Sequence, residues 1–150
     1  MEIRQIVDDK LNYMNLLLEA DPDEDIVKKY LADGDMYVLF EDDIPAAEIV
    51  IINVNEEECE LKNIATLKSA RGKGYARKLI NYVFEIYSKK GYKKMIVGTT
   101  ENMIPFYVLS GFDRYHHTVK NFFVDNYKEP IFDGTLQCID MYYYAKNLGN

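Results

Sequence analysis

The spacing of apolar residues changes its period several times along the chain, and each change predicts a new strand or helix. Residues 2–7 alternate between apolar and polar side chains, which is typical of a short strand. Residues 8–20 instead place apolar side chains three and four positions apart, as on one face of a helix. The Asp-Pro-Asp sequence at 21–23 is a helix start signal, and this second helix is expected to end at Gly34 in a left-handed cap.

The middle of the chain predicts three largely apolar strands followed by the clearest helix. The strands are expected at residues 36–40, 46–54 and 59–67, with turns at 41–44 and 56–58. Residues 75–90 form an amphipathic helix, because their apolar side chains fall on one face and Gly91 follows at the end. The remaining elements are a strand at 94–99, a helix at 103–109 and strands at 112–119 and 137–144, which flank an aromatic segment at 121–134.

This order of elements predicts an α/β fold with a mixed sheet, in a single domain that spans residues 1–150. The composition, with 48% apolar and 13% aromatic residues, is that of a packed globule. The apolar runs are far shorter than the roughly 20 residues of a membrane span, and the N-terminus shows no signal-peptide pattern. We therefore expect a cytoplasmic protein in which Cys59 and Cys138 stay reduced.

One window of the sequence differs from the rest in its charge. The chain has 25 Asp and Glu against 18 Lys and Arg, a formal net charge of −7, which argues against nucleic acid and membrane partners and agrees with a cationic substrate. Residues 61–84 nevertheless contain Lys and Arg but no acid, and most of these charges lie within 68–78. A charge run alone would indicate a solvated helix end. Here glycines and a helix start coincide with it, so we expect this segment to bind an anion such as phosphate.

The glycines of this window lie in a recognisable motif. Residues 71–76, Arg-Gly-Lys-Gly-Tyr-Ala, match the signature Gln/Arg-x-x-Gly-x-Gly/Ala, with Asn-Ile-Ala-Thr before it at 63–66 and a segment from Asn102 to Phe112 after it. On these residues the chain resembles the GNAT superfamily of N-acetyltransferases over nearly its whole length. The resemblance implies the GNAT fold, a mostly antiparallel sheet of about six or seven strands that splays between its fourth and fifth strands, with about four helices. It also implies acetyl-CoA as cosubstrate and no metal.

The resemblance implies two ways of holding the coenzyme. The backbone at the end of the fourth strand binds the pantetheine arm as an added pseudo-strand, and the loop wraps the pyrophosphate with its main-chain amides, since glycine permits close approach. The residues assigned to the coenzyme are Ile64, Ala65, Thr66, Arg71, Gly72, Lys73, Gly74, Tyr75, Ala76, Arg77 and Asn102. The alternative for Asn102 is a helix N-cap. A Walker loop has a different glycine order, and a dinucleotide fingerprint needs a glycine where Arg77 lies.

Two residues are candidates for proton transfer. Tyr107 lies four residues before Gly111, where the resemblance places a tyrosine that protonates the departing thiolate; the alternative is a core aromatic. Glu60 is the candidate base that takes the proton of the amine through a water, and the alternative is a solvent-facing glutamate. Strand alternation predicts that Glu60, Lys62 and Ile64 share one face.

Other reactive side chains give weaker patterns. His116 and His117 are adjacent on an expected strand and should point to opposite faces, so we predict no metal site there. A cysteine nucleophile would need a neighbouring base that activates its thiol, and the sequence displays no such pair for Cys59 or Cys138, which favours direct transfer over a covalent intermediate. The aromatic segment at 121–134 either shapes a substrate pocket, covers the core or contacts another subunit.

The sequence thus predicts an enzyme that transfers the acetyl group of acetyl-CoA to a primary amine in a ternary complex. The acceptor is expected to be a small cationic amine or a peptide amine, and the protein a monomer or homodimer. The alternative function is a non-catalytic module that binds acyl-CoA and regulates a partner. Such a module would keep the phosphate loop but would need neither Tyr107 nor Glu60.

Overall fold

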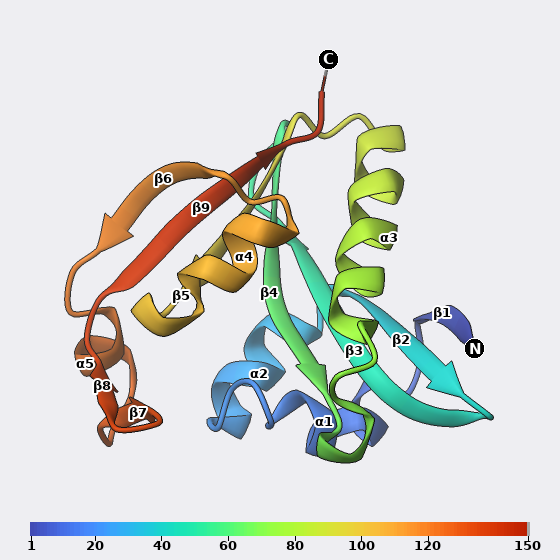
Figure 1. Ribbon diagram of the computed structural model, residues 1–150, viewed down its shortest axis with the longest axis horizontal. Helices are drawn as coiled ribbons and strands as arrows, with labels where there is room; N and C mark the ends of the chain where they lie inside the picture. The colour runs from blue at the N-terminus through green and yellow to red at the C-terminus, as the bar shows by residue number, and fades with distance from the viewer. Residues whose placement is uncertain (150) are drawn as a thin grey trace.

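A computed structural model describes residues 1–149 and contains a seven-stranded sheet with helices on both faces (Figure 1). The sheet has the order β1-β2-β3-β4-β5-β9-β6, and β7 and β8 form a separate hairpin. The strands are β1 (Glu2–Ile6), β2 (Asp35–Glu41), β3 (Ile44–Asn53), β4 (Glu58–Thr66), β5 (Lys94–Thr99), β6 (Arg114–Val119), β7 (Ile131–Asp133), β8 (Leu136–Cys138) and β9 (Met141–Asn147). The α-helices are α1 (Met14–Leu17), α2 (Glu24–Leu31), α3 (Tyr75–Lys89), α4 (Ile104–Ser110) and α5 (Phe122–Asn126). The predicted α/β class and mixed sheet are confirmed.

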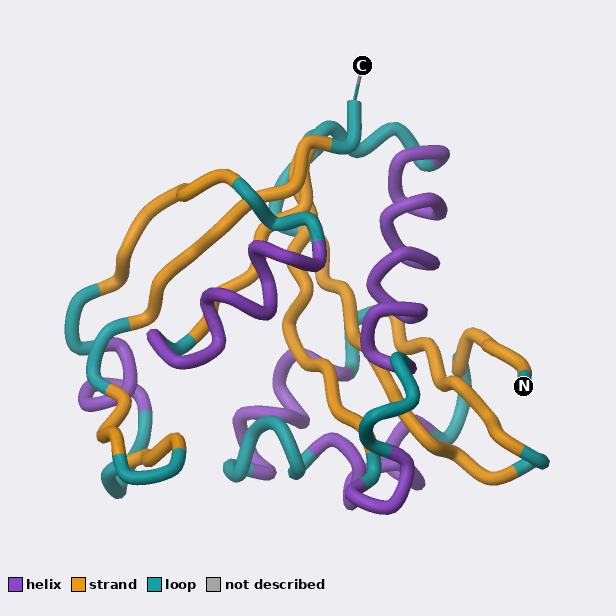
Figure 2. The backbone as a smooth tube through the Cα atoms, in the orientation of Figure 1, coloured by secondary structure: helices purple, strands orange, loops and turns teal. Residues whose placement is uncertain are grey.

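The sheet splits between β4 and β5, its one parallel pair. These strands pair through only four residues of each, from Glu58 to Leu61 in β4. Beyond Leu61, β4 continues to Thr66 with β3 as its partner, and β5 continues past Val97 with β9 as its partner. The half that carries β6 and β9 therefore diverges from β4 toward the bottom of the view, as the tube in Figure 2 also shows. The predicted splay between the fourth and fifth strands is confirmed.

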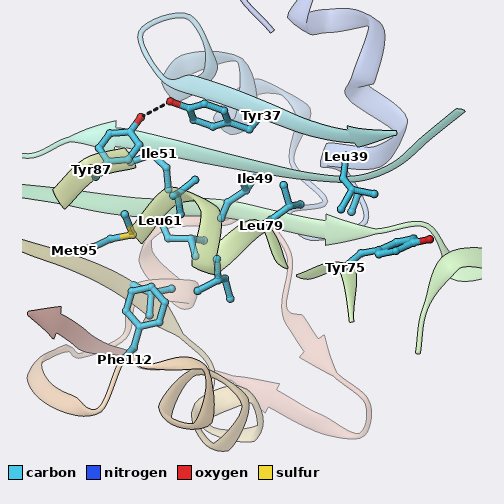
Figure 3. Packing of buried hydrophobic residues seen from close by; sticks show 14 of the residues in the cluster. Tyr37, Leu39, Ile49, Ile51, Leu61, Tyr75, Leu79, Tyr87, Met95 and Phe112 are labelled. Carbon is cyan, nitrogen blue, oxygen red and sulfur yellow. Dashed lines mark hydrogen bonds between the residues drawn. The ribbon is translucent and has the colours of Figure 1, made fainter. Parts of the chain in front are cut away.

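The larger hydrophobic core lies under α3. Leu79 and Val83, one turn apart on α3, are completely buried against strand residues such as Ile49 (Figure 3). Each such side chain contributes about 1.5–3 kcal/mol to stability through burial. At one end of this core the hydroxyls of Tyr37 and Tyr87 lie 3.3 Å apart and form a buried hydrogen bond. The amphipathic pattern of residues 75–90 thus produced the helix that was predicted.

A smaller core lies on the opposite face, under α1 and α2, and here the predicted helices differ from the structure. Residues 8–20 do not form one helix: a 3-10 turn at Lys10–Tyr13 is followed by α1, which has four residues. Asp9, at the expected start, has a left-handed φ of 60° and makes no side-chain cap. The apolar stripe still packs, because Leu17 is completely buried. Short helices of this kind depend on tertiary packing more than on their own propensity.

Gly34 also has another role than the predicted left-handed cap. Helix α2 ends at Leu31, and Gly34 is not among the residues with positive φ. An added Cβ at Gly34 would lie 2.8 Å from Cγ1 of Val50 and 3.0 Å from the carbonyl oxygen of Tyr30. The glycine is needed there because the chain passes close to β3.

Strand β4 contains a bulge that changes which side chains share a face. Leu61 lies opposite Ile51 and Asn63 lies opposite Val50, so Lys62 is the extra residue. Leu61 consequently belongs to the core under α3, while Asn63 donates a hydrogen bond to the carbonyl of Leu17 on the opposite face. The prediction that Glu60, Lys62 and Ile64 share one face is wrong, because Ile64 packs on the α3 side and Glu60 lies opposite Ile52 of the smaller core.

The C-terminal part departs from prediction in two places. The last strand begins at Met141 rather than at 137, and the aromatic segment contains α5 and the β7–β8 hairpin. Another bulge, at His116, interrupts the pairing of β6 with β9. His116 and His117 therefore do not point apart, and their Nδ1 atoms lie 2.6 Å from each other.

A glutamate is completely buried in the middle of β3. Glu48 lies opposite Val38 of β2 and Ala65 of β4, and neither of its carboxyl oxygens has a hydrogen-bond partner among residues 1–149. Burial raises the pKa of Glu48 well above its usual range, because the charged form loses its hydration. Asn63 Oδ1, two residues from Ala65 on the neighbouring strand, is likewise unpaired within residues 1–149.

Replacing this carboxyl should change how stability depends on pH. The pKa of Glu48 is higher in the folded chain than in the unfolded one, so the folded chain keeps this proton to higher pH. The free energy of unfolding therefore falls as pH rises from the unfolded-state pKa of Glu48 to its folded-state pKa. Glu48→Gln should remove part of this fall and raise the midpoint of thermal unfolding at neutral pH relative to the parent. Thermal unfolding from about pH 4 to about pH 8 measures it. Exposed Glu56→Gln is the control, and parallel curves for all three proteins would contradict the prediction.

Candidate active site

A cavity of about 1380 Å³ opens where β4 and β5 separate. Its wall includes the unpaired end of β4, the loop before α3, the start of α4 and the aromatic segment after β6. The predicted site residues that line it are Ile64, Ala65, Thr66, Arg71, Gly72, Gly74, Tyr75, Ala76, Arg77 and Tyr107. Lys73, Glu60 and Asn102 are not part of its wall. The splay thus brings most of the predicted residues to one cavity.

The loop before α3 has the backbone geometry that an anion site requires. Gly72 has a φ of 83° and Gly74 a φ of 77°, which is left-handed backbone that favours glycine. Gly74 is the N-cap of α3 and offers no side chain to the first-turn amides, so these N–H groups have no capping partner. An added Cβ at either glycine would meet no atom within 4 Å. The loop therefore presents helix N-terminal amides beside open space, which suits a phosphate group.

The basic side chains around the loop have partners within the protein. Arg71 Nε donates to the carbonyl of Thr66 at 3.4 Å, and its guanidinium lies 3.9 Å from Glu19. Lys73 Nζ lies 3.1 Å from Glu41 Oε1, at the end of β2. Tyr75 also donates to Glu41, and the hydrogen bonds from Tyr75 and Lys73 lower the pKa of this glutamate. These cations are held near the loop by exposed acids.

Arg77 has a different partner. Its Nη2 donates to the carbonyl oxygen of Leu109 at 2.7 Å, in the last turn of α4. A cation at a helix C-terminus interacts favourably with the helix dipole, so Arg77 joins the start of α3 to the end of α4. This contact gives Arg77 a structural role beside any contact with an anion.

Tyr107 lies on α4 with its ring in the core and its edge on the cavity. Its side chain is 9% exposed, and its ring makes edge contacts with Phe106 and Phe112. Burial, with a smaller effect from the charge of Glu48, raises the pKa of Tyr107 to about 12. The hydroxyl therefore keeps its proton at neutral pH.

Glu60 and Asn102 lie outside the cavity wall. The carboxylate of Glu60 is 3.7 Å from Lys62 Nζ, and Lys62, but not Glu60, lines the cavity. Burial raises the pKa of Glu60, and the charge of Lys62 opposes this. Asn102 Nδ2 donates to the main-chain oxygen of Asp133 at 3.3 Å and makes no helix cap. Asn102 thus ties the β7–β8 hairpin to the start of α4.

Asp21, which the sequence indicates only as part of a helix start signal, has a carboxylate that also lines the cavity. Asp21 accepts hydrogen bonds from the hydroxyl of Tyr127 at 3.1 Å, from the amide of Asp23 at 3.2 Å and from the hydroxyl of Tyr30 at 3.4 Å. Burial raises the pKa of Asp21 and these donors oppose the shift. Nothing in the local sequence pairs Asp21 with Tyr127, which lies 106 residues away.

The other reactive groups lie outside this arrangement. Burial raises the pKa of the Cys59 thiol to about 12, which makes it a poor nucleophile at neutral pH. His116 Nε2 lies 3.3 Å from Glu58, and within residues 1–149 no three His, Cys, Asp or Glu side chains gather as a metal site requires. None of the helices formed by residues 1–149 has the length and apolar content needed to cross a bilayer.

The fold and the glycine loop together define an acetyltransferase. Residues 3–112 match the model of the acetyltransferase (GNAT) family, and the chain belongs to this family. It is similar to YvbK of Bacillus subtilis (strain 168), an uncharacterized N-acetyltransferase, with 33% identity over 144 residues that cover 94% of this chain and 91% of the relative.

Two solved structures extend the likeness. A GNAT family acetyltransferase from Elizabethkingia anophelis with acetyl-CoA bound has a TM-score of 0.92 and 30% identity, with 97% of each chain covered. An acetyltransferase of Bacillus subtilis in complex with CoA has a TM-score of 0.86 and 29% identity, again with 97% of each chain covered. The predicted GNAT fold and acetyltransferase class are confirmed.

Proposed function

We propose that the protein transfers the acetyl group of acetyl-CoA directly to a primary amine within a ternary complex. The observation that carries the proposal is the single cavity whose wall includes the glycine loop, the unpaired end of β4 and Tyr107. The similar structures that contain acetyl-CoA and CoA support the same coenzyme here. The acidic net charge and the carboxylate of Asp21 in the wall support a cationic amine as the acceptor.

The residues of the cavity fit the coenzyme in two places. The amides of residues 72–77 lie in the glycine loop and the first turn of α3, where the N-cap Gly74 supplies no capping side chain and the Cβ positions of Gly72 and Gly74 are open, so they suit the pyrophosphate. The backbone of Ile64, Ala65 and Thr66 has no strand partner on the side of β5, so it suits the amides of the pantetheine arm. Phosphates would draw Arg71 and Lys73 away from Glu19 and Glu41. Asn102 would contact the coenzyme near the start of α4.

Bound acetyl-CoA supplies the acetyl group as a thioester. Backbone amides at the end of β4 would polarise its carbonyl, and one such donor is worth about 3–4 kcal/mol in acyl transfer. Tyr107 carries the proton that the leaving sulfur takes, and its raised pKa keeps that proton in place until the C–S bond breaks. Glu60 is the proposed base. It would receive the proton of the amine through a water next to Lys62, because Lys62 lines the cavity and its Nζ lies 3.7 Å from Glu60.

Two glycines provide a matched test of coenzyme binding. Gly72 and Gly91 have φ values of 83° and 96°, and neither has an atom within 4 Å of an added Cβ. Alanine at either position should cost about 1 kcal/mol of stability from left-handed backbone. Only Gly72→Ala should reduce the rise in unfolding temperature that acetyl-CoA produces, which for the parent corresponds to about 2.7 kcal/mol at about 100 times Kd. Thermal shift measures both effects, and equal coenzyme responses would exclude a binding role for the loop.

Tyr107→Phe should lower kcat by about a hundredfold to ten-thousandfold, because it removes only the proton donor. The ring stays in place against Phe106 and Phe112, so the stabilisation by acetyl-CoA should not change. Release of the CoA thiol with an active amine measures the rate. An unchanged kcat would leave Tyr107 as a core aromatic.

Glu60→Gln should lower kcat by about a hundredfold and leave acetyl-CoA binding intact. The parent should lose activity toward acid through a pKa above the usual range of a glutamate, because burial raises the pKa of Glu60 and only the ionised form accepts a proton. The variant should lose this acid limb of the profile of kcat against pH. Glu56→Gln, on the exposed turn before β4, is the control, and an unchanged acid limb in Glu60→Gln would remove Glu60 as the base.

A further inference from the structure

The half of the cavity that lies away from the glycine loop has an aromatic wall. Its rings come from Tyr30 of α2 and from Phe122, Phe123, Tyr127 and Phe132 of the segment after β6. The rings of Phe123 and Tyr127 are nearly parallel, with centroids 5.9 Å apart and an interplanar angle of 25°. Of the roles expected for the aromatic segment, the structure favours that of a pocket wall. Such a wall suits a flexible apolar stem that carries charge only at its ends.

Asp21 lies at the edge of this wall and is held there by hydrogen bonds to its carboxyl group. Both oxygens accept hydrogen bonds, from Tyr127 and the amide of Asp23 on Oδ1 and from Tyr30 on Oδ2. Donors on both oxygens favour the charged form. Asn63 Nδ2 donates to the Tyr30 hydroxyl at 2.9 Å, so this phenol directs its own proton toward Asp21. Burial raises the pKa of Asp21 and these donors oppose the shift, so the carboxyl group is fixed at the cavity by groups that stabilise its charged form.

The same wall already holds one primary ammonium group of the protein. Lys62 Nζ lies 5.7 Å from the centroid of the Tyr30 ring and 3.7 Å from Glu60 Oε2. An alkylammonium therefore sits between a carboxylate and an aromatic ring in this cavity. A ligand with an alkyl chain and an ammonium end would find the corresponding pair in Asp21 and the rings of Tyr30 and Tyr127.

The charged groups near Asp21 favour the binding of a cation over that of an anion. Besides Asp21, the acid Asp133 lines this part of the cavity and accepts from the hydroxyl of Thr100 at 3.1 Å. The wall also contains two lysines. The charge of Lys62 is balanced by Glu60, and Lys29 lies on the exposed side of α2. The net charge of the chain is −7, which raises the local concentration of polycations.

On the basis of the proposed function, we propose that the acceptor is an aliphatic diamine or polyamine whose non-reacting ammonium binds Asp21. The nitrogen that attacks must lose its proton, whereas a carboxylate stabilises the charged form, so Asp21 serves the far end of the acceptor. The methylene stem lies against the aromatic wall, and the second nitrogen extends toward Tyr107 in the same cavity. Asp21 is then a specificity residue: it selects acceptors with a second cation.

Two probe amines separate this inference from the proposed function. Cadaverine and pentylamine share one stem and one reacting amine and differ only by the terminal ammonium. Calorimetry on the CoA-saturated protein should find that cadaverine binds at least about tenfold more tightly than pentylamine. The ratio of kcat/KM for acetyl transfer should show the same preference, mainly through KM. Equal binding of the two amines would overturn the inference even if both are acetylated. Preferential binding of cadaverine with no acetyl transfer to either amine would support the ammonium site at Asp21 but overturn the proposed function, and with it the role of the diamine as acceptor.

Three variants assign the preference to Asp21. Asp21→Asn should abolish it, and exposed Asp25→Asn, which removes the same charge outside the cavity wall, should keep it. Tyr127→Phe removes one hydroxyl from Asp21 but no charge, and it should also keep the preference. Coenzyme-induced thermal stabilisation reports that each variant is folded. If Tyr127→Phe also lost the preference, the hydrogen bond between Tyr127 and Asp21 would serve only to hold the aromatic segment in place. That result would overturn the role of Asp21 as the ammonium site.

Discussion

The separation of β4 from β5 after four residue pairs is the constraint on which the rest of the site depends. A strand edge inside a cavity carries N–H and C=O groups that need partners, and an unpaired buried group costs about as much as a lost hydrogen bond. The N–H and C=O groups at the end of β4 have a strand partner, β3, on one side only. A ligand with its own amides can fill the other side, and this is why the cavity lies at the splay rather than elsewhere on the sheet.

The glycine loop adds charge recognition to this backbone site. Left-handed φ values at Gly72 and Gly74 turn the chain into α3 without a capping side chain. In an acidic protein, exposed basic side chains attract acids of the same chain, and Arg71 and Lys73 accordingly pair with Glu19 and Glu41. These exposed pairs contribute little stability, so phosphates can replace them at small cost, while the acids keep the cations close to the loop.

Much of this arrangement was readable in the sequence, because it rests on local patterns. Helix α3, the strands before it and the glycine loop follow from periodicity and from backbone preferences that neighbours in sequence determine. The bulge at Lys62 could not be predicted, because the alternation of side chains along a strand gives no sign of an extra residue. This bulge places Ile64 on the opposite face of the sheet from Glu60. The contact of Asp21 with Tyr127 joins segments 106 residues apart, and only the folded chain brings them together.

A crystal structure of the protein with CoA tests these interactions most directly. The pyrophosphate should accept hydrogen bonds from the amides of residues 72–77, and the pantetheine amides should pair with the backbone of residues 64–66. Arg71 and Lys73 should move from their acidic partners toward the phosphates. A coenzyme bound elsewhere, with the loop and the edge of β4 unchanged, would show that the splayed strand does not form the coenzyme site.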